Sequence, residues 1–294
     1  MVRLGMAIAP DAVTCCRIRV RRGRSILQGA ARVPLPAGTV TVRFGGLLIT
    51  DEGTFAAGLT RALTEAGARP GEIGLALPDR ATRMGTLRFE RLQRSRADMK
   101  ELIRWRLKDL LPFRPAEARV EYQVLPRPSD GQQEVLWLLA HEPAVAQVEA
   151  VLVKAGLIPV SIVNRACALF HLWEAKGEAP GEHLLVWDEP ETTTIVLTRD
   201  RMPRFWRVIP TPSANGDREE RAERAVAMVR ETLEYLRETL GVEEAVTLWA
   251  AGEVASPGAL ATLAGAGVPV RALDVPGCSQ ETLVPTGAAV AAST

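Results

Sequence analysis

The chain has 294 residues, of which 47% are hydrophobic, so it is long enough to bury the cores of two lobes. Its 36 lysines and arginines balance 35 aspartates and glutamates to a net charge of +1, which gives no overall electrostatic case for nucleic-acid binding. The four cysteines form no C-x-x-C pair and the three histidines lack the spacing of a ligand pair, so we expect neither a metal site nor a redox motif.

The sequence offers no segment that would insert into a membrane. No apolar run reaches the roughly 18 residues that a membrane-spanning helix needs. The N-terminal "MVRLGMAIAP" has one arginine and too short an apolar stretch for a signal peptide. We therefore expect a cytosolic chain with reduced cysteines, which can still dock on a membrane protein.

The first part of the chain predicts strands and one helix. "RLGMAIAPDAVTCCRIRVRRGRSIL" is typical of short strands with turns, with Arg17, Arg19 and Arg21 on the outer face of one strand. "VTVRFGGLLI" predicts a further strand, and "DEGTFAAGLTRALTEAGA" predicts a helix that ends at Gly67. "EIGLALP" predicts a short buried strand that its proline ends.

The stretch "LIRWRLKDLLPFRPAEARVEYQVL" joins a predicted helix to a predicted strand. Ser95 is placed to cap a helix over 96–111, and Pro112 stops that helix because it lacks an N–H and clashes with the preceding turn. Phe113 can fold back over the helix end, and a strand follows over 118–125. The residues expected on the buried helical face are Met99, Leu102, Ile103, Leu107 and Leu110.

The rest of the chain alternates strands and helices. The pattern predicts strand 134–141, helix 143–156, strand 157–163 and helix 164–175. "GEAPGE" (177–182) is the best candidate for an interlobe hinge. Beyond it we expect strands with a hairpin turn near Asp200, an amphipathic helix over 217–240, and then strand "AVTLWAAGE", helix "SPGALATLAGAG", strand "VPVRALD" and a final helix "PTGAAVAA". Two α/β lobes that each begin with a hairpin suggest an internally duplicated fold.

The helix–strand join resembles the signature of the PilM type IV pilus assembly proteins. The matching residues are Ile103, Arg104, Trp105, Pro112, Phe113, Tyr122, Gln123 and Val124. Flanking pieces such as "IGLALPD", "AGLIPVSIVNRACALF", "RFWRVIP" and "PTGAAVAA" resemble the family in the same order, so the similarity covers nearly the whole chain.

The resemblance implies a two-lobed actin-like (ASKHA) α/β fold, related to FtsA, with an inserted strand–helix–strand–strand subdomain. Residues 1–79 and 158–176 would form the first lobe, 80–157 the insertion and 177–294 the second lobe. The family carries a small helical subdomain over the nucleotide, whereas this chain has only 211–217 at that point, so we expect the second lobe to be reduced.

Typical family members bind ATP between the lobes, in turns that need glycine for close approach and aspartate for Mg²⁺. The corresponding positions are altered here: Ala7, Ala9, Trp187, Asp188, Glu189 and Gly252. Ala7 and Trp187 stand where the family has aspartate, while Glu189 and Glu191 would repel phosphates. We interpret this as a pseudo-ATPase without a cofactor or enzymatic activity. Asp188 is either a shifted Mg²⁺ residue or, as we favour, a solvated turn carboxylate.

The resemblance also implies a partner. PilM-like proteins bind the short cytoplasmic N-terminal tail of PilN, a single-span inner-membrane protein, so this chain would be a cytoplasmic scaffold that associates peripherally with the inner membrane, with other pilus platform or motor components as further possible partners. The tail would lie in a groove whose floor is Leu107, Leu111 and Phe113, with Arg104 as a donor. Alternatively these side chains only hold the subdomain together, which we favour for Leu107. We expect Arg104→Ala to weaken tail binding at a nearly unchanged melting temperature.

Three alternatives stay open. The chain could bind ATP through shifted residues, which titration with Mg-ATP would test. It could be the cytoplasmic region of a GspL-like type II secretion protein; such a protein is expected to continue into a membrane span, and the genomic neighbourhood would distinguish the two. A nucleic-acid role for the cluster 17–24 is disfavoured because no stacking aromatics are interleaved, and we expect a solvated edge strand there.

Overall fold

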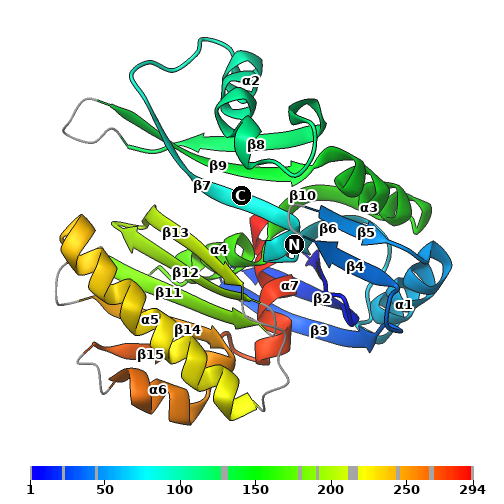
Figure 1. Cartoon of the computed structure of the whole chain (residues 1–294). Helices are drawn as coiled ribbons and strands as arrows, with labels where there is room; N and C mark the ends of the chain where they lie inside the picture. Colours follow the sequence, from blue (N-terminus) through cyan, green and yellow to red (C-terminus); the bar gives the residue numbers. More distant parts are fainter. Residues whose placement is uncertain are drawn as a thin grey trace. The chain divides into compact units, whose positions relative to one another are not determined.

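The computed structural model describes residues 2–21, 24–43, 46–126, 132–177, 181–189, 192–210, 218–242, 246–264 and 268–292 (Figure 1). The chain divides into two compact units. The first unit contains Met1–Leu172 and Val284–Thr294, and the second contains Trp173–Leu283. The C-terminal residues therefore group with the first unit, whereas we expected them in the second lobe. The central part of the predicted hinge, 178–180, lies outside the described residues.

The first unit is built on a five-stranded sheet in the order β10-β6-β1-β2-β3. Its strands are β1 (Val2–Ile8), β2 (Ala12–Arg21), β3 (Arg24–Pro34), β6 (Glu72–Leu77) and β10 (Ile158–Asn164). β1, β2 and β3 form an antiparallel meander, and β6 runs parallel to both β1 and β10. The basic strand β2 thus lies inside the sheet, so our expectation of an edge strand is wrong: the edge strands of this sheet are β3 and β10.

One face of this sheet is covered by α1 (Glu52–Glu65) and α3 (Glu142–Lys154), which share a core with the strands. Asp51 caps α1 by accepting from the Thr54 N–H at 2.9 Å, and Gly67, with a φ of +63°, follows the helix end as predicted. α3 was expected in the inserted subdomain, yet it packs with the first-lobe core because its valines face the sheet.

"VTVRFGGLLI" forms two strands, so our prediction of a single strand is wrong. β4 (Val40–Arg43) pairs antiparallel with β5 (Gly46–Ile49), with Arg43 opposite Gly46. The adjacent glycines in the middle of the run weaken an extended strand and favour a reversal.

The other face of the sheet packs against α7 (Gln280–Ala291), and α7 in turn packs against α4 (Arg165–Ala175) through Gly287. A β-carbon at Gly5 would lie 1.8 Å from the Pro285 carbonyl oxygen, and one at Gly74 would lie 2.0 Å from that of Ala288. Glycine is therefore required at both sheet positions, because the backbone of α7 lies directly against them. This packing explains why the small-residue C-terminal helix groups with the first unit.

A separate three-stranded antiparallel sheet, in the order β7-β9-β8, lies between β6 and β10 in the chain. Its elements are β7 (Thr82–Phe89), α2 (Arg96–Leu107), β8 (Ala118–Val124) and β9 (Gln133–His141), with short 3-10 turns at Asp79–Ala81, Lys108–Leu110 and Pro115–Glu117. α2 packs on one face of this sheet (Figure 1). We call β7, α2, β8 and β9 the inserted sheet.

The second unit holds another five-stranded sheet, in the order β13-β12-β11-β14-β15. Its elements are β11 (Glu182–Glu189), β12 (Thr192–Arg199), β13 (Met202–Pro210), α5 (Arg218–Leu240), β14 (Thr247–Gly252), a 3-10 turn (Glu253–Ala255), α6 (Pro257–Ala264) and β15 (Val270–Ala272). α5 and α6 cover one face. Asp200 and Arg201 form the predicted hairpin turn with φ of 51° and 64°. β13 and α5 are separated by 211–217, which lie outside the described residues.

Within the described ranges, no helix is both long and apolar enough to cross a membrane.

Candidate functional site

The join between α2 and β8 is built around a small apolar core. Ser95 accepts a hydrogen bond from the Asp98 N–H at 3.0 Å, which confirms the predicted cap. Met99, Ile103 and Leu107 are buried against the inserted sheet. The helical face that the sequence predicted is therefore largely the one that packs.

The end of α2 differs from the prediction. The α-helix ends at Leu107, and one 3-10 turn carries the chain to Leu111, which has the extended backbone expected before Pro112 (φ −90°, ψ 134°). The 3-10 turn winds more tightly than an α-helix, so it rotates Leu110 off the buried face. Leu110 is 54% exposed, and its expected burial is wrong.

Phe113 folds back as expected, onto a partner that the sequence did not indicate. Its ring lies 4.5 Å from the His141 ring, centroid to centroid, with the planes tilted by 36°. Phe113 and Leu111 are both half-buried against the core that contains Leu107. The Pro112–Phe113 segment thus ties the helix end to the last residue of β9.

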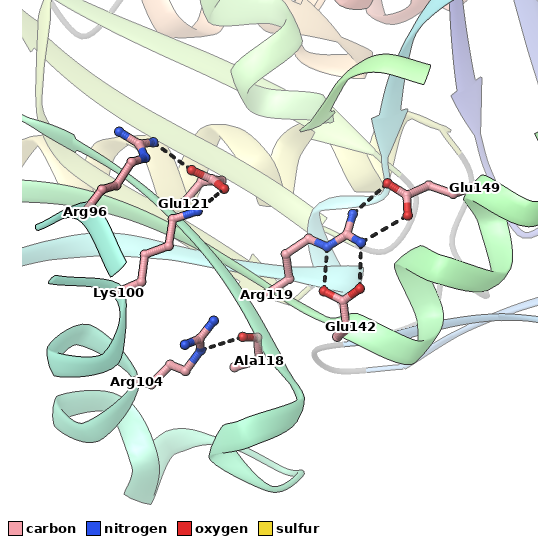
Figure 2. A network of polar contacts seen from close by, with 8 residues as sticks. All are labelled: Arg96, Lys100, Arg104, Ala118, Arg119, Glu121, Glu142 and Glu149. Atoms are coloured by element: carbon pink, nitrogen blue, oxygen red, sulfur yellow. Dashed lines mark hydrogen bonds and ion pairs between the residues drawn. The ribbon is translucent and has the colours of Figure 1, made fainter. Parts of the chain in front are cut away.

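A network of polar contacts also holds the same join (Figure 2). The Arg104 Nε donates to the Ala118 carbonyl oxygen at 2.8 Å, and its Nη1 pairs with Glu101. Arg104 therefore connects α2 to the first residue of β8. Glu121 on β8 accepts from two α2 residues, Arg96 and Lys100.

Arg119 links β8 to the start of α3 (Figure 2). Its guanidinium donates to both Glu142 oxygens at 2.6 Å and to the Glu149 oxygens at 2.6 and 3.0 Å. These hydrogen bonds raise the pKa of Arg119, and the bond from Arg119 lowers the pKa of Glu142. Gln147, also on α3, pairs with both backbone groups of Ile49 in β5 at 2.8 and 3.0 Å. The inserted sheet and the two-stranded β4–β5 sheet of the first unit are thus both anchored to α3.

The structure brings the predicted tail-binding residues together around one core. Leu107 is 3% exposed, so it serves the core and offers no surface to a ligand. Sequence reasoning missed the most exposed apolar side chain of the join, Trp105, which is 61% exposed and has the Lys108 Nζ 5.2 Å from its ring centre. A helical projection could have found it, because Trp105 falls opposite Met99 and Ile103.

The end of β1 and the turn after it, which include Ala7 and Ala9, correspond to the first phosphate-binding turn implied by the resemblance. Together they carry no free carboxylate. Ala7 is 4% exposed, and the Ala9 N–H donates to the Ala12 carbonyl oxygen at 2.8 Å. Asp11, beyond the turn, pairs with Arg32 at 2.6 Å. Arg165, at the start of α4, donates to the Ile8 carbonyl oxygen at 2.8 Å, and burial lowers its pKa to about 10 despite the opposing charges of Asp79 and Asp11.

The other two altered turns, at Trp187–Glu189 and at Gly252, lie next to each other inside the second unit. Trp187 is 8% exposed, and its indole N–H has no hydrogen-bond partner among the described residues. Asp188 is 3% exposed and accepts from the Thr193 hydroxyl, so our interpretation of a solvated turn carboxylate is wrong. The reason is that β11 extends past Asp188 to Glu189 and places it inside the strand.

Gly252 packs directly against that position. A β-carbon there would lie 2.1 Å from the Asp188 carbonyl oxygen, and its φ is +77°. The Gly252 N–H donates to Gln280 Oε1 at 2.9 Å, so this amide is already used. Glu191 lies outside the described residues, and across the described ranges no group of three His, Cys, Asp or Glu side chains could hold a metal ion.

Comparison with known proteins identifies the fold. No family model matches the sequence, and no curated protein matches it. The two α/β units have an actin-like fold: a solved protein from Bacteroides thetaiotaomicron, described as having an actin-like ATPase fold and unknown function, matches with a TM-score of 0.51 at 10% identity, over 92% of this chain and 90% of its own. The actin-like fold expected from the sequence is confirmed.

A more similar structure is a chain of a PilM-PilN type IV pilus biogenesis complex. It matches with a TM-score of 0.78 at 22% identity, over 99% of this chain and 97% of its own. The cytoplasmic domain of EpsL, an inner-membrane component of the type II secretion system of Vibrio cholerae, matches with a TM-score of 0.57 at 9% identity, over 98% and 94%.

Proposed function

We propose that this chain is a non-enzymatic cytoplasmic scaffold of a type IV pilus-like inner-membrane platform, and that it binds the cytoplasmic N-terminal tail of a PilN-like single-span membrane protein. The observation that carries the proposal is the full-length likeness to a chain of the PilM-PilN complex. The higher TM-score, 0.78 against 0.57 for EpsL, favours the pilus platform over the type II secretion alternative. Other platform or motor components are further candidate partners.

The proposed absence of enzymatic activity is supported by the side chains in the degenerate turns. Ala7 has no carboxylate to hold Mg²⁺ through water, and the Asp188 carboxylate is buried against Thr193. Trp187 places a bulky apolar ring where the family has an aspartate. Ala7 and Trp187 thus lack the carboxylates that the metal would need, and the Asp188 carboxylate is already bonded to Thr193.

The tail site that we propose is the surface of the α2–β8 join. An extended peptide needs apolar contacts and a few donors. Leu111 and Phe113 are half-buried, and Trp105 and Leu110 are mostly exposed, so together they offer apolar surface beside Arg104. The Arg104 side chain is 22% exposed, although two of its nitrogens already serve the join.

The hydrogen bond from Arg104 to Ala118 changes the stability that we expect of the Arg104→Ala variant. The variant loses the bond to Ala118, so its unfolding free energy should fall by about 1 kcal/mol, in contrast to the nearly unchanged melting temperature expected from the sequence. Leu110→Ser is the cleaner probe of binding, because a side chain that is 54% exposed contributes little to the core.

Isothermal titration with the tail peptide tests the proposal. We expect Arg104→Ala and Leu110→Ser each to weaken binding by about tenfold. Arg61→Ala is the control, since Arg61 lies on α1, away from the join, and pairs with Glu65 across the helix surface. Wild-type affinity in both join variants would show that the tail binds elsewhere.

A further inference from the structure

We propose that a basic cavity at the start of β1 binds a small phosphate-bearing anion. The cavity measures about 530 Å³ and lies within the first unit. The charged residues that line it are Arg3 on β1, Arg17 on β2, Arg69 in the segment after α1, and Glu72 at the start of β6. Three guanidinium groups against one carboxylate give this lining a formal charge of +2.

The positive charges of two of the three arginines, Arg17 and Arg69, are not neutralised by any carboxylate among the described residues. The Arg3 Nη1 donates to the Ala292 carbonyl oxygen at 3.2 Å, and the same nitrogen lies 3.6 Å from the Glu72 Oε2. Among the residues that the structure describes, neither Arg17 nor Arg69 has a hydrogen-bond or ion-pair partner. The Arg17 Nε is fully enclosed without an acceptor, a costly arrangement for a charged group unless something neutralises it.

The Arg17 side chain has room at the cavity because residue 67 is a glycine. Its Nη2 would lie 3.5 Å from a β-carbon at Gly67, so the absence of a side chain there leaves room for the guanidinium beside the helix end. Gly67 has a φ of +63°, a conformation that favours glycine independently.

The chemistry of the lining selects the ligand class. Arginine presents a rigid fork of N–H donors that matches phosphate oxygens in a bidentate way. A volume of about 530 Å³ falls in the usual range for small-molecule pockets and exceeds what a single phosphate ion would fill. The best match is therefore a soluble compound with two phosphoryl groups, or with one phosphoryl group on a small organic body.

This cavity is distinct from the sites described above. Arg3 lies near the beginning of β1, whereas the turn at Ala9 follows its end, about 20 Å away along a strand that rises about 3.3 Å per residue. No residue of the inserted sheet lines it. The inference goes beyond the proposed scaffold function, and its failure would leave tail binding unaffected.

Calorimetric titration of the full chain with sodium pyrophosphate at low ionic strength tests the inference. We expect saturable binding that Arg17→Gln weakens by about tenfold or more and Arg69→Gln by about threefold. Arg61→Gln, an arginine on α1 that pairs with Glu65, should bind like the wild type. Sulfate, with a single anionic group, should bind more weakly than pyrophosphate.

Several results would overturn the inference. One is the absence of pyrophosphate binding by the wild type, and another is equal binding by wild type, Arg17→Gln and Arg69→Gln. Arg69 is exposed, so Arg69→Gln should fold normally and keeps the test valid even if Arg17→Gln disturbs folding. Retention on phosphatidylglycerol vesicles that requires Arg17, without pyrophosphate binding, would assign the cavity to a membrane lipid and contradict the soluble ligand.

Discussion

Replacing Arg119 with alanine should destabilise the first unit more than replacing any exposed arginine of the join. Arg119 makes four hydrogen bonds to Glu142 and Glu149, and its side chain is 33% exposed. Its loss leaves two carboxylates close together without their shared cation. Exposed ion pairs contribute about 0–1 kcal/mol, whereas charge-assisted bonds in partly buried geometry contribute about 1.5–3 kcal/mol. We therefore expect a loss of about 2 kcal/mol, or roughly 4–8 °C in melting temperature.

Thermal unfolding followed by circular dichroism measures this effect. Arg114→Ala is the matched control, because Arg114 pairs with Glu117 but is 83% exposed, and it should change stability by less than about 0.5 kcal/mol. The bond from Arg119 lowers the pKa of Glu142 below its ordinary 4.5, so this contribution is present above that pH and is lost as the pH falls through the folded-state pKa. The cost of Arg119→Ala should accordingly shrink as the pH is lowered from 4.5 through that folded-state pKa. Equal melting temperatures for the two variants at neutral pH would refute the reasoning.

Three further outcomes are expected. Gly252→Ala should destabilise the second unit by more than about 2 kcal/mol in denaturant titrations, since its β-carbon would overlap the Asp188 carbonyl oxygen; a neutral effect would contradict the close packing. Phe113→Ala should lower the unfolding free energy by about 1–3 kcal/mol, less than the 3–5 kcal/mol typical of a fully buried phenylalanine, because the Phe113 ring is half-buried on His141. The folded variant should also bind the tail peptide more weakly, and wild-type affinity in a titration would contradict this. Mg-ATP should give neither a thermal shift nor hydrolysis, and a saturable shift at millimolar concentration or below would favour the ATP-binding alternative.

The fold was largely accessible from the sequence, because most segments carry a clear period and clear boundaries. The cap at Ser95 and the glycine after α1 act locally, and local signals are readable. The assignment of residues 284–294 was not accessible in this way. It depends on backbone contact between the C-terminal helix and Gly5 and Gly74, which are distant in sequence.

The candidate site was predictable only in outline. The sequence placed Arg104, Leu111 and Phe113 at one join, but it could not distinguish a surface donor from an arginine that bonds a distant carbonyl group. Whether Leu110 is exposed depends on a switch from α to 3-10 winding that no residue type marks. Asp188 was misjudged because the length of β11 depends on pairing with β12 and β14.

Hydrogen exchange with and without the tail peptide tests the central proposal most directly, because it locates the bound peptide without relying on a substitution. The account predicts that a saturating tail peptide from a PilN-like protein slows exchange at amides of residues 104–118, around the end of α2 and the segment that leads into β8. Amides of α5 in the second unit should be unaffected. Protection confined to another region of the chain, or no protection at saturating peptide, would contradict the proposed scaffold site.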